Sequence, residues 1–217
     1  MGKIVKILKT KDVGSIGIGA MIVFIAMVLV AGIAASVLIQ TSVRLETQAL
    51  ATGSETTAEV ATGVAVFDVL GYTVNSTEDI SKIAIGIRPR AGSDSVDISQ
   101  CFLELANSSI KVIMNYTTSY YAEPDGQDDV FNANVFPVSA SQFGVLVVED
   151  ADNSLSSTAP VMNRGDKVYL CVNTTETHSD LDERTDVWGM VAPEEGSPGV
   201  VSFTTPASYT DNVLDLQ

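Results

Sequence analysis

The sequence predicts an α+β fold in which a long hydrophobic N-terminal α-helix precedes an immunoglobulin-like β-sandwich. Two observations predict it: a long uncharged apolar stretch near the N-terminus, and short β-branched runs separated by turn signals after residue 60. A chain of 217 residues has room for one long helix and one domain of about 150 residues. We divide it into a short basic segment at 1–14, a helix at 15–59 and a β-domain at 60–217.

The apolar stretch runs from Ser15 to Val43 without a charged residue. As a helix it spans about 44 Å, more than the ~30 Å hydrocarbon core of a membrane. It is too long for the apolar part of a secretory signal and has no Ala-x-Ala site, so we expect it to be retained and any cleavage to precede it. Apolar residues occupy every face, so lipid or other helices must surround it.

The charges on the two sides of this stretch differ in sign. Four lysines and one aspartate precede Ser15, whereas eight basic and 26 acidic residues follow it, a net charge of about −18. The positive-inside tendency therefore keeps the basic end in the cytoplasm and places the acidic body outside. An acidic body also argues against nucleic-acid binding.

Seven runs in the body have strand character, and we see no internal repeat among them. They are separated by Gly- and Pro-rich turns, a pattern typical of a sandwich. The runs are Val64–Val74, Ser81–Arg88, Ser95–Ala106, Ile110–Thr117, Phe143–Glu149, Lys167–Asn173 and Gly199–Thr204.

Four Asn-x-Ser/Thr sequons occur in the body, each near a strand end or in a turn. For a domain expected outside the cell, they predict N-glycosylation. The acceptors are Asn75, Asn107, Asn115 and Asn173.

Two cysteines, Cys101 and Cys171, lie about 70 residues apart in strand-like runs. Outside the cell a disulfide between them is allowed. Sequence does not show whether their Cβ atoms approach, so a bridge and two separately packed thiols stay open as alternatives. A zinc site is not indicated, because there is no CxxC and only one histidine.

No motif predicts an enzyme. The single histidine, His178, lies in a loop-like segment without a nucleophile motif, and no phosphate- or dinucleotide-binding loop is present. We expect no cofactor. Two acidic loops, Asp125–Asp129 and Glu149–Asn153, carry oxygens that suit Ca²⁺ or Mg²⁺, with a solvated turn as the simpler reading.

The N-terminal residues resemble one known family. Gly17–Ala31, followed by Ala34–Ser42, is similar to the archaeal flagellins (archaellins), which are type IV pilin-like filament subunits. Weaker likeness lies at Thr62–Phe67, Gly71, Ala91–Ser93, Ile98–Ser99, Arg164–Val168 and Phe203–Pro206.

The resemblance implies a structural subunit of the archaellum filament, which works as a swimming propeller. A prepilin peptidase would remove residues 1–14, a class III (prepilin-type) leader, between Gly14 and Ser15. The family usually has two basic residues before that glycine, whereas this chain has Asp12 and Val13, and Gly17 is the alternative.

The resemblance also implies the location and the partners. The chain would be inserted in the membrane transiently and then join an extracellular filament. Its partners would be its own copies, paralogous archaellins, the membrane assembly machinery and the N-glycosylation machinery.

Two alternatives remain at the level of sequence. An adhesion pilus subunit has the same leader and helix, although such pilins often carry Glu at the fifth mature position, where this chain has Gly19. A membrane-anchored β-domain receptor would keep residues 1–14 and remain in the membrane. Sheared extracellular filaments that contain the chain would exclude the receptor.

Overall fold

The chain begins with one long helix. The computed structural model describes residues 2–75 and 78–217, and within the helix the side chains of residues 2–13 and 15 lie outside the description. Helix α1 runs from Gly2 to Ala61, so the helix expected at 15–59 is part of a longer one. Gly53 does not interrupt it, and the amide of Thr62 still donates to the carbonyl of Ala58 at 2.7 Å.

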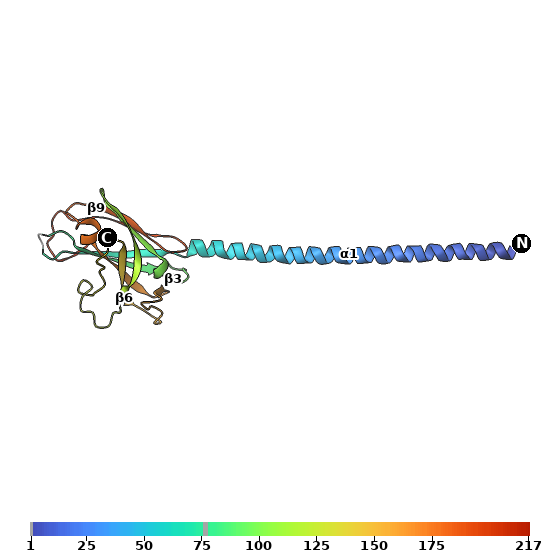
Figure 1. The fold of residues 1–217 in the computed structure, drawn as a ribbon, viewed down its shortest axis with the longest axis horizontal. Coiled ribbons are helices and arrows are strands. Elements are labelled where there is room, and N and C mark those ends of the chain that lie inside the picture. The colour runs from blue at the N-terminus through green and yellow to red at the C-terminus, as the bar shows by residue number, and fades with distance from the viewer. Residues whose placement is uncertain (1, 76–77) are drawn as a thin grey trace. The chain divides into compact units, whose positions relative to one another are not determined.

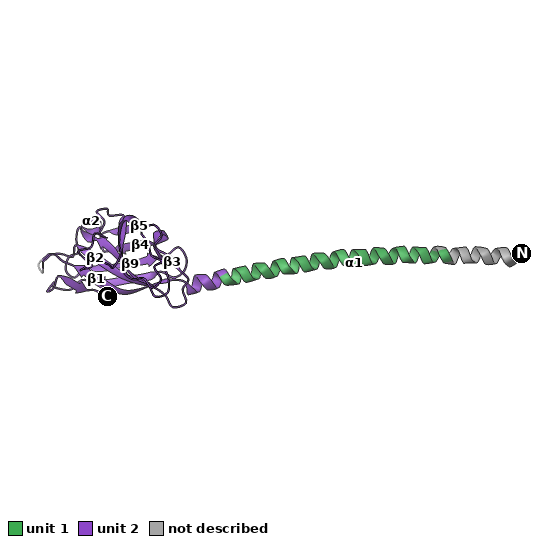
Figure 2. Ribbon diagram, turned by 90° about the horizontal axis from the view of Figure 1, so that it is seen from below, with its two compact units in different colours: residues 1–54 green, residues 55–217 purple. Residues whose placement is uncertain are grey.

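The structure divides into two compact units, residues 1–54 and residues 55–217 (Figure 2). The second unit contains the last turns of α1 and every described strand (Figure 1). The strands are β1 (Val64–Tyr72), β2 (Lys82–Pro89), β3 (Val96–Asp97), β4 (Phe102–Ala106), β5 (Lys111–Ala122), β6 (Gln142–Glu149), β7 (Val161–Met162), β8 (Lys167–Asn173), β9 (Asp186–Ala192), β10 (Gly199–Thr204) and β11 (Val213–Asp215). A 3₁₀ turn, η1 (Ile98–Gln100), and a short helix, α2 (Thr174–His178), lie between them.

Nine strands form one sheet in the order β10-β9-β4-β5-β6-β8-β2-β1-β11, and β3 pairs with β7 separately. Neighbours are antiparallel except β5 and β6, which are parallel. The two ends of the sheet approach each other, because β1 contacts β10 and the amide of Val64 donates to the carbonyl of Ser197 at 3.1 Å. The curved sheet encloses the main core, and the prediction of a long apolar helix followed by a β-rich domain is confirmed.

A second apolar cluster lies on the other face of β2, β6 and β8. The loop at 123–141 covers this face with Phe131 and Phe136, which are both buried. Phe131 stacks on Tyr72 with ring centroids 5.0 Å apart. The Lys82 ammonium donates to the carbonyl of Phe131 at 2.8 Å and lies 4.7 Å from the Phe136 ring centroid. These contacts hold a loop that is otherwise polar.

The strand prediction was wrong in two respects. Ser95–Ala106 is not one strand, because the Asp97 carboxylate accepts the amide of Ser99 at 2.8 Å and turns the chain into η1. Strands β7, β9 and β11 were not predicted. The sequence of β9 begins with Asp186 and contains Gly189, which weaken the strand pattern.

Candidate assembly and modification sites

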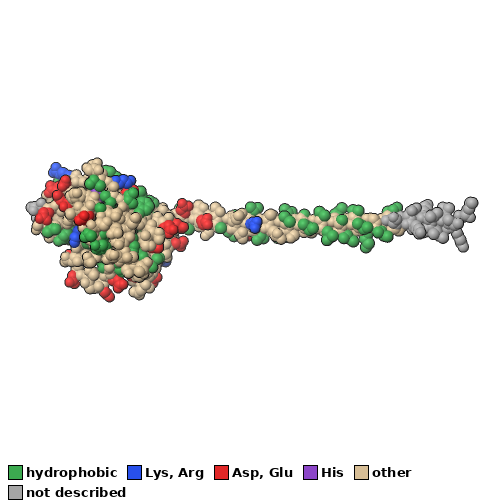
Figure 3. All heavy atoms as spheres, viewed as in Figure 1, with side chains coloured by type: hydrophobic (Ala, Val, Ile, Leu, Met, Phe, Trp, Pro, Cys, Tyr) green, Lys and Arg blue, Asp and Glu red, His purple; other side chains and the backbone are tan. Residues whose placement is uncertain are grey.

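The apolar side chains of α1 are exposed on all sides. Every large hydrophobic residue from Ile16 to Val43 is at least 50% exposed, and Figure 3 shows hydrophobic side chains along both edges of the helix. The segment from Ile16 is long and apolar enough to span a membrane, with a mean hydropathy of 3.0 in its most apolar window and none of that window buried. Such a surface is stable only when lipid or other protein covers it.

Small residues recur on this surface at intervals of four positions, which places them on the same side of the helix. Ala31 and Ala35 are four residues apart, as are Gly32 and Ser36. A Cβ added to Gly32 would meet no atom within 4 Å in the single chain. The small residues therefore leave room for the backbone of another helix.

The expected cleavage site lies at the edge of the described side chains. Gly14 is exposed within α1, and a Cβ added there would meet nothing within 4 Å. The side chains of Ser15 and of residues 2–13, as well as Met1, lie outside the described residues.

The four sequon asparagines differ in exposure. Asn75 and Asn115 are exposed, whereas Asn107 and Asn173 are half-buried. Asn107 accepts the amides of Ser109 and Ile110 in the turn between β4 and β5. Asn173 occupies the N-cap position of α2, and its side chain makes no capping hydrogen bond within the described part of the chain. Ser76 and Thr77 of the first sequon lie outside the described residues.

Asn115 lies on an apolar part of the exposed sheet surface. It is opposite Phe102 in the pairing of β4 with β5, and Ile113, two residues before it, is on the same face. Trp188 and Val200 of the neighbouring strands are exposed on this face, at 47% and 62%. A glycan on Asn115 would begin beside these side chains.

The cysteines are free and buried, so the structure has the second alternative, two separately packed thiols. Cys101 belongs to the main core and Cys171 to the second cluster on the opposite face of β8. Burial raises the pKa of Cys101 to about 12 and also raises the pKa of Cys171. Neither thiol is activated as a nucleophile.

The acidic loop Glu149–Asn153 becomes part of a three-carboxylate group. Asp150 and Asp152 meet Asp166, with one oxygen of each within 4.8 Å of the others. Asp166 is buried, and it accepts the amides of Ala151 at 3.1 Å and Asn163 at 2.8 Å. Hydrogen bonds from Ser154 and Asn163 lower the pKa of Asp152. Three carboxylates in this arrangement offer the oxygen ligands that suit Ca²⁺ or Mg²⁺.

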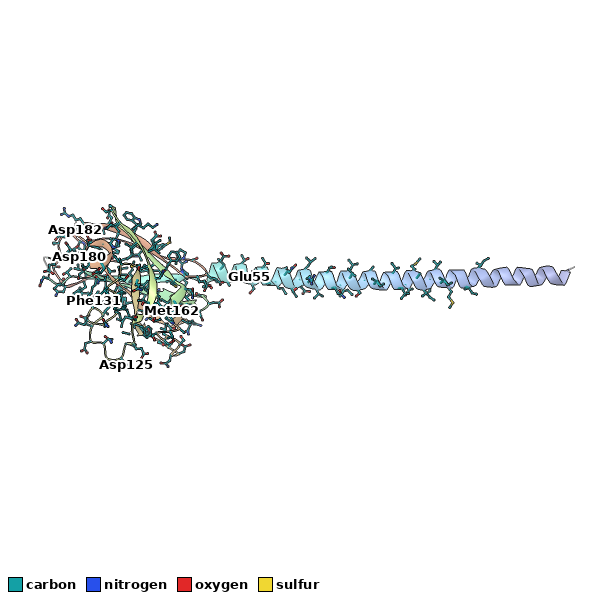
Figure 4. The ribbon with its side chains drawn as sticks, viewed as in Figure 1. Glu55, Asp125, Phe131, Met162, Asp180 and Asp182 are labelled. Atoms are coloured by element: carbon teal, nitrogen blue, oxygen red, sulfur yellow. The ribbon has the colours of Figure 1, made fainter. Side chains whose placement is uncertain are left out.

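The other acidic loop gathers no such group among the described residues. Asp125 and Asp128 are exposed, and Figure 4 labels Asp125. Asp129 accepts the amide of Phe131 at 3.2 Å. This loop is a solvated turn anchored by its aromatic residues.

His178 is a buried residue of α2. Its Nδ1 lies 2.9 Å from the Thr177 hydroxyl, which donates to the carbonyl of Asn173 at 3.1 Å. Nε2 is buried and meets no partner at hydrogen-bond geometry among the residues that the structure describes, although the backbone of Leu105 acts on the ring. Burial lowers the pKa of His178, and the backbone of Leu105 opposes this only in part.

Two of these features were not found from sequence. Asp166 was missed as the third carboxylate because it is 14 residues beyond Asp152, across the β7–β8 turn. The apolar face around Trp188 was missed because β9 was not recognised as a strand.

A family model and individual relatives point to the same family. The family model of archaeal-type flagellin matches residues 14–203. Flagellin B2 of Methanocaldococcus jannaschii is 42% identical over 219 residues, covering 99% of this chain and 100% of that protein. Flagellin B1 of Methanococcus voltae is 39% identical, covering 94% of this chain and 95% of that protein.

Solved structures match as well. The crystal structure of archaeal flagellin FlaB1 from Methanocaldococcus jannaschii aligns with a TM-score of 0.63 at 35% identity, covering 72% of this chain and 98% of that one. The archaeal flagellum of Methanospirillum hungatei aligns with a TM-score of 0.61, covering 91% of this chain and 98% of that one. At 12% identity the second match bears on the fold alone.

Proposed function

Because the chain belongs to the archaeal-type flagellin family and is a structural subunit of the extracellular archaeal flagellum (archaellum) filament, we propose that α1 is the segment through which its copies bundle. The observation that carries this proposal is the exposed apolar surface of α1 from Ile16 to Val43. Each copy covers the surface of its neighbours, and the β-domains lie outside. Paralogous archaellins with a similar helix can join the same bundle.

The same surface explains how a subunit waits before assembly. We propose that the precursor is held in the membrane by α1, with its basic end in the cytoplasm and its acidic β-domain outside. Assembly machinery in the membrane then moves the helix from lipid to protein. This transfer exchanges one apolar surrounding for another, so no large hydration penalty opposes it.

We propose that a prepilin peptidase removes residues 1–14 and leaves Ser15 as the first mature residue. Removal takes away four lysines, whose charges would otherwise enter the helical bundle. Mass spectrometry of sheared filaments tests this. The expected N-terminal peptide begins at Ser15, and a peptide beginning at Ile18, or intact leader residues in filaments, would contradict it.

We propose N-glycosylation of the outer domain by the cell's N-glycosylation machinery. The exposures of Asn75 and Asn115 support high occupancy there, and the half-buried positions of Asn107 and Asn173 support lower occupancy. Glycopeptide mass spectrometry of native filaments gives the occupancy of each sequon. Equal occupancy at all four sites would show that exposure in the folded domain does not control the modification.

We also propose that Asp150, Asp152 and Asp166 hold a structural Ca²⁺ or Mg²⁺, which would link the β6–β7 loop to the β7–β8 turn. Ca²⁺ should raise the unfolding temperature of the wild-type chain, and Asp152→Asn should remove most of that rise. Asp125→Asn, in the other acidic loop, is the matched control and should keep it. An unfolding temperature that does not respond to Ca²⁺, Mg²⁺ or chelator would refute the site.

The filament role itself is tested in cells. Deleting the gene should remove or shorten the filaments and impair swimming, unless a paralogue replaces the subunit. Shearing and the swimming assay together separate the filament from both alternatives considered from sequence. An adhesion pilus would be recovered in shear fractions without any loss of swimming on deletion, and a receptor would stay with the membranes.

A further inference from the structure

Basic side chains gather around one pocket of this acidic domain. The pocket has a volume of about 770 Å³, and its lining includes Arg88, Arg90, Arg164 and Lys167. They meet because β2 and β8 are antiparallel neighbours, with Ile87 opposite Val168. The residues just after Ile87 and those just before Val168 therefore lie at the same end of the sheet. The chain has only twelve Lys and Arg residues, and four of them line this pocket.

Two of the four cations have no partner in the described part of the chain. The ammonium of Lys167 lies 2.7 Å from a carboxylate oxygen of Glu149. The guanidinium of Arg90 donates to the carbonyls of Val64 at 3.2 Å and Pro198 at 3.3 Å. Arg88 and Arg164 are exposed and make no hydrogen bond or ion pair there. The pocket thus presents two free guanidinium groups.

The last turns of α1 present the opposite charge. Glu55 and Glu59 are four residues apart on one face of the helix, and both are exposed (Figure 4 labels Glu55). Like charges at this spacing repel, and the carboxylates are close to the negative end of the helix dipole. No basic residue lies in the last turn, and neither glutamate has an ion pair with any side chain that the structure describes.

Both features lie close to Gly63. The amide of Arg90 donates to the carbonyl of Gly63 at 2.9 Å, and the amide of Gly63 donates to the Ser93 hydroxyl at 3.2 Å. Arg90 and Ser93 line the pocket, and Glu59 is only four residues before Gly63. Each subunit therefore carries two acidic and two basic side chains near Gly63. None of the four has an ion-pair partner among the described residues.

We propose that Arg88 and Arg164 of one subunit bind Glu55 and Glu59 of a neighbouring copy in the filament. A filament repeats a contact between two different patches of the same chain, and these two patches are complementary in charge. Arginine suits the role because its planar guanidinium can bind a carboxylate through two hydrogen bonds. The inference rests on the filament role but not on how α1 bundles. It names a second contact, one that fixes the position of a β-domain against the helix of the next subunit.

Charge reversal in the full-length chain tests the contact. The chain is expressed in cells that lack their own copy of the gene, and sheared filaments are quantified over a range of NaCl concentrations. Arg88→Glu with Arg164→Glu should reduce filament yield at least tenfold, as should Glu55→Arg with Glu59→Arg. The four substitutions together should restore yield to within about twofold of wild type. Arg184→Glu and Glu176→Arg are exposed controls outside the pocket and should keep wild-type yield.

Cysteine cross-linking tests the same contact with smaller substitutions, in case the charge-reversed variants fail to fold. Arg88→Cys with Glu59→Cys should give disulfide-linked ladders of subunits in sheared filaments, while Arg184→Cys with Glu59→Cys should give none. Wild-type yield in both reversed variants, no recovery in the fourfold variant, or no ladder would each overturn the contact. In all three cases wild-type filaments still form, so the filament role stands. A wild-type chain absent from filaments would overturn that role instead.

Discussion

At the scale of single residues, the buried histidine makes the domain sensitive to mild acid. Burial lowers the pKa of His178, so the folded state favours the neutral ring. The unfolded chain takes up a proton near the ordinary value of 6.5, and the folded chain only at lower pH. The contribution of His178 to stability is therefore complete above about pH 6.5 and declines as the pH falls below it.

Unfolding of the detergent-solubilised chain checks this, with Trp188, the single tryptophan, as the fluorescent probe. Between pH 7.5 and 5.5 the wild type should lose stability with a slope of at most about 1.4 kcal/mol per pH unit, the limit for one proton. His178→Gln should remove that slope. Asp79, whose pKa is raised by burial and by Asp182, acts in the opposite direction, so it can only reduce the slope that His178 produces. An unchanged slope in the variant would assign the pH dependence to another group.

The cysteines give a prediction that distinguishes the two alternatives left by the sequence. Both thiols are buried and both have raised pKa values, so neither should react with a thiol reagent in the folded chain at neutral pH. In denaturant without reductant, two thiols per chain should react. If they react only after reduction, the chain contains a disulfide and the packing of Cys101 and Cys171 must differ from that described.

At the scale of elements, the loop at 123–141 depends on one aromatic side chain. Phe131 is 2% exposed, and it stacks between Tyr72 and Phe136. Phe131→Ala should cost about 3 kcal/mol of unfolding free energy and make the loop sensitive to protease. Val138→Ala, in the same loop at 72% exposure, should change stability by less than about 0.5 kcal/mol. Equal effects of the two substitutions would show that the loop is not held by its aromatic residues.

A substitution in a different element, α1, should impair filament assembly without destabilising the β-domain. Gly32→Val adds a branched side chain that meets nothing in the single chain, so unfolding of the β-domain should not change. In the bundle it should hold neighbouring helices apart and reduce filament yield at least tenfold. Gly53→Ala, in the polar part of α1, is the matched control and should leave yield unchanged while favouring the helix by about 1 kcal/mol. Normal filaments from Gly32→Val would place Gly32 away from close helix contacts.

The sequence predicted the long helix and most long strands because their patterns are local. Strand β8 shows the reason: Val168, Leu170 and Val172 all point into the main core. Strand β9 could not be recognised, because Gly189 takes the place of an inward-facing apolar residue. A Cβ there would collide with the backbone of Glu104 on β4, so glycine is required by a partner that the local sequence does not reveal.

At the scale of the whole molecule, the β-domain should fold without the apolar part of α1, because residues 55–217 form a compact unit. A chain of residues 44–217 should be a soluble monomer with the same unfolding temperature as the detergent-solubilised full chain, within about 2 °C. Light scattering and Trp188 fluorescence measure the two properties. Aggregation or loss of cooperative unfolding would show that α1 contributes to the stability of the domain.

The candidate sites were less accessible from sequence than the fold, because they depend on the pairing of distant strands. The sequons and the expected cleavage site are local motifs and could be read directly. The three-carboxylate group needed the turn between β7 and β8 to bring Asp166 to Asp150. The basic pocket needed the pairing of β2 with β8 to join Arg88 with Arg164, which are 76 positions apart.

The absence of a polar stripe on α1 also affects how a filament can bend. A helix with one apolar face has one preferred rotation about its own axis, because any other rotation exposes that face. From Ile16 to Val43 α1 has large apolar side chains all round, so a small turn or slide that keeps small residues such as Gly32 in contact replaces one apolar contact with a similar one. In the bundle proposed for α1, such helices should resist separation while offering little resistance to small rotations. A curved, rotating filament needs that combination, since each subunit passes from the inner to the outer side of the curve once per revolution.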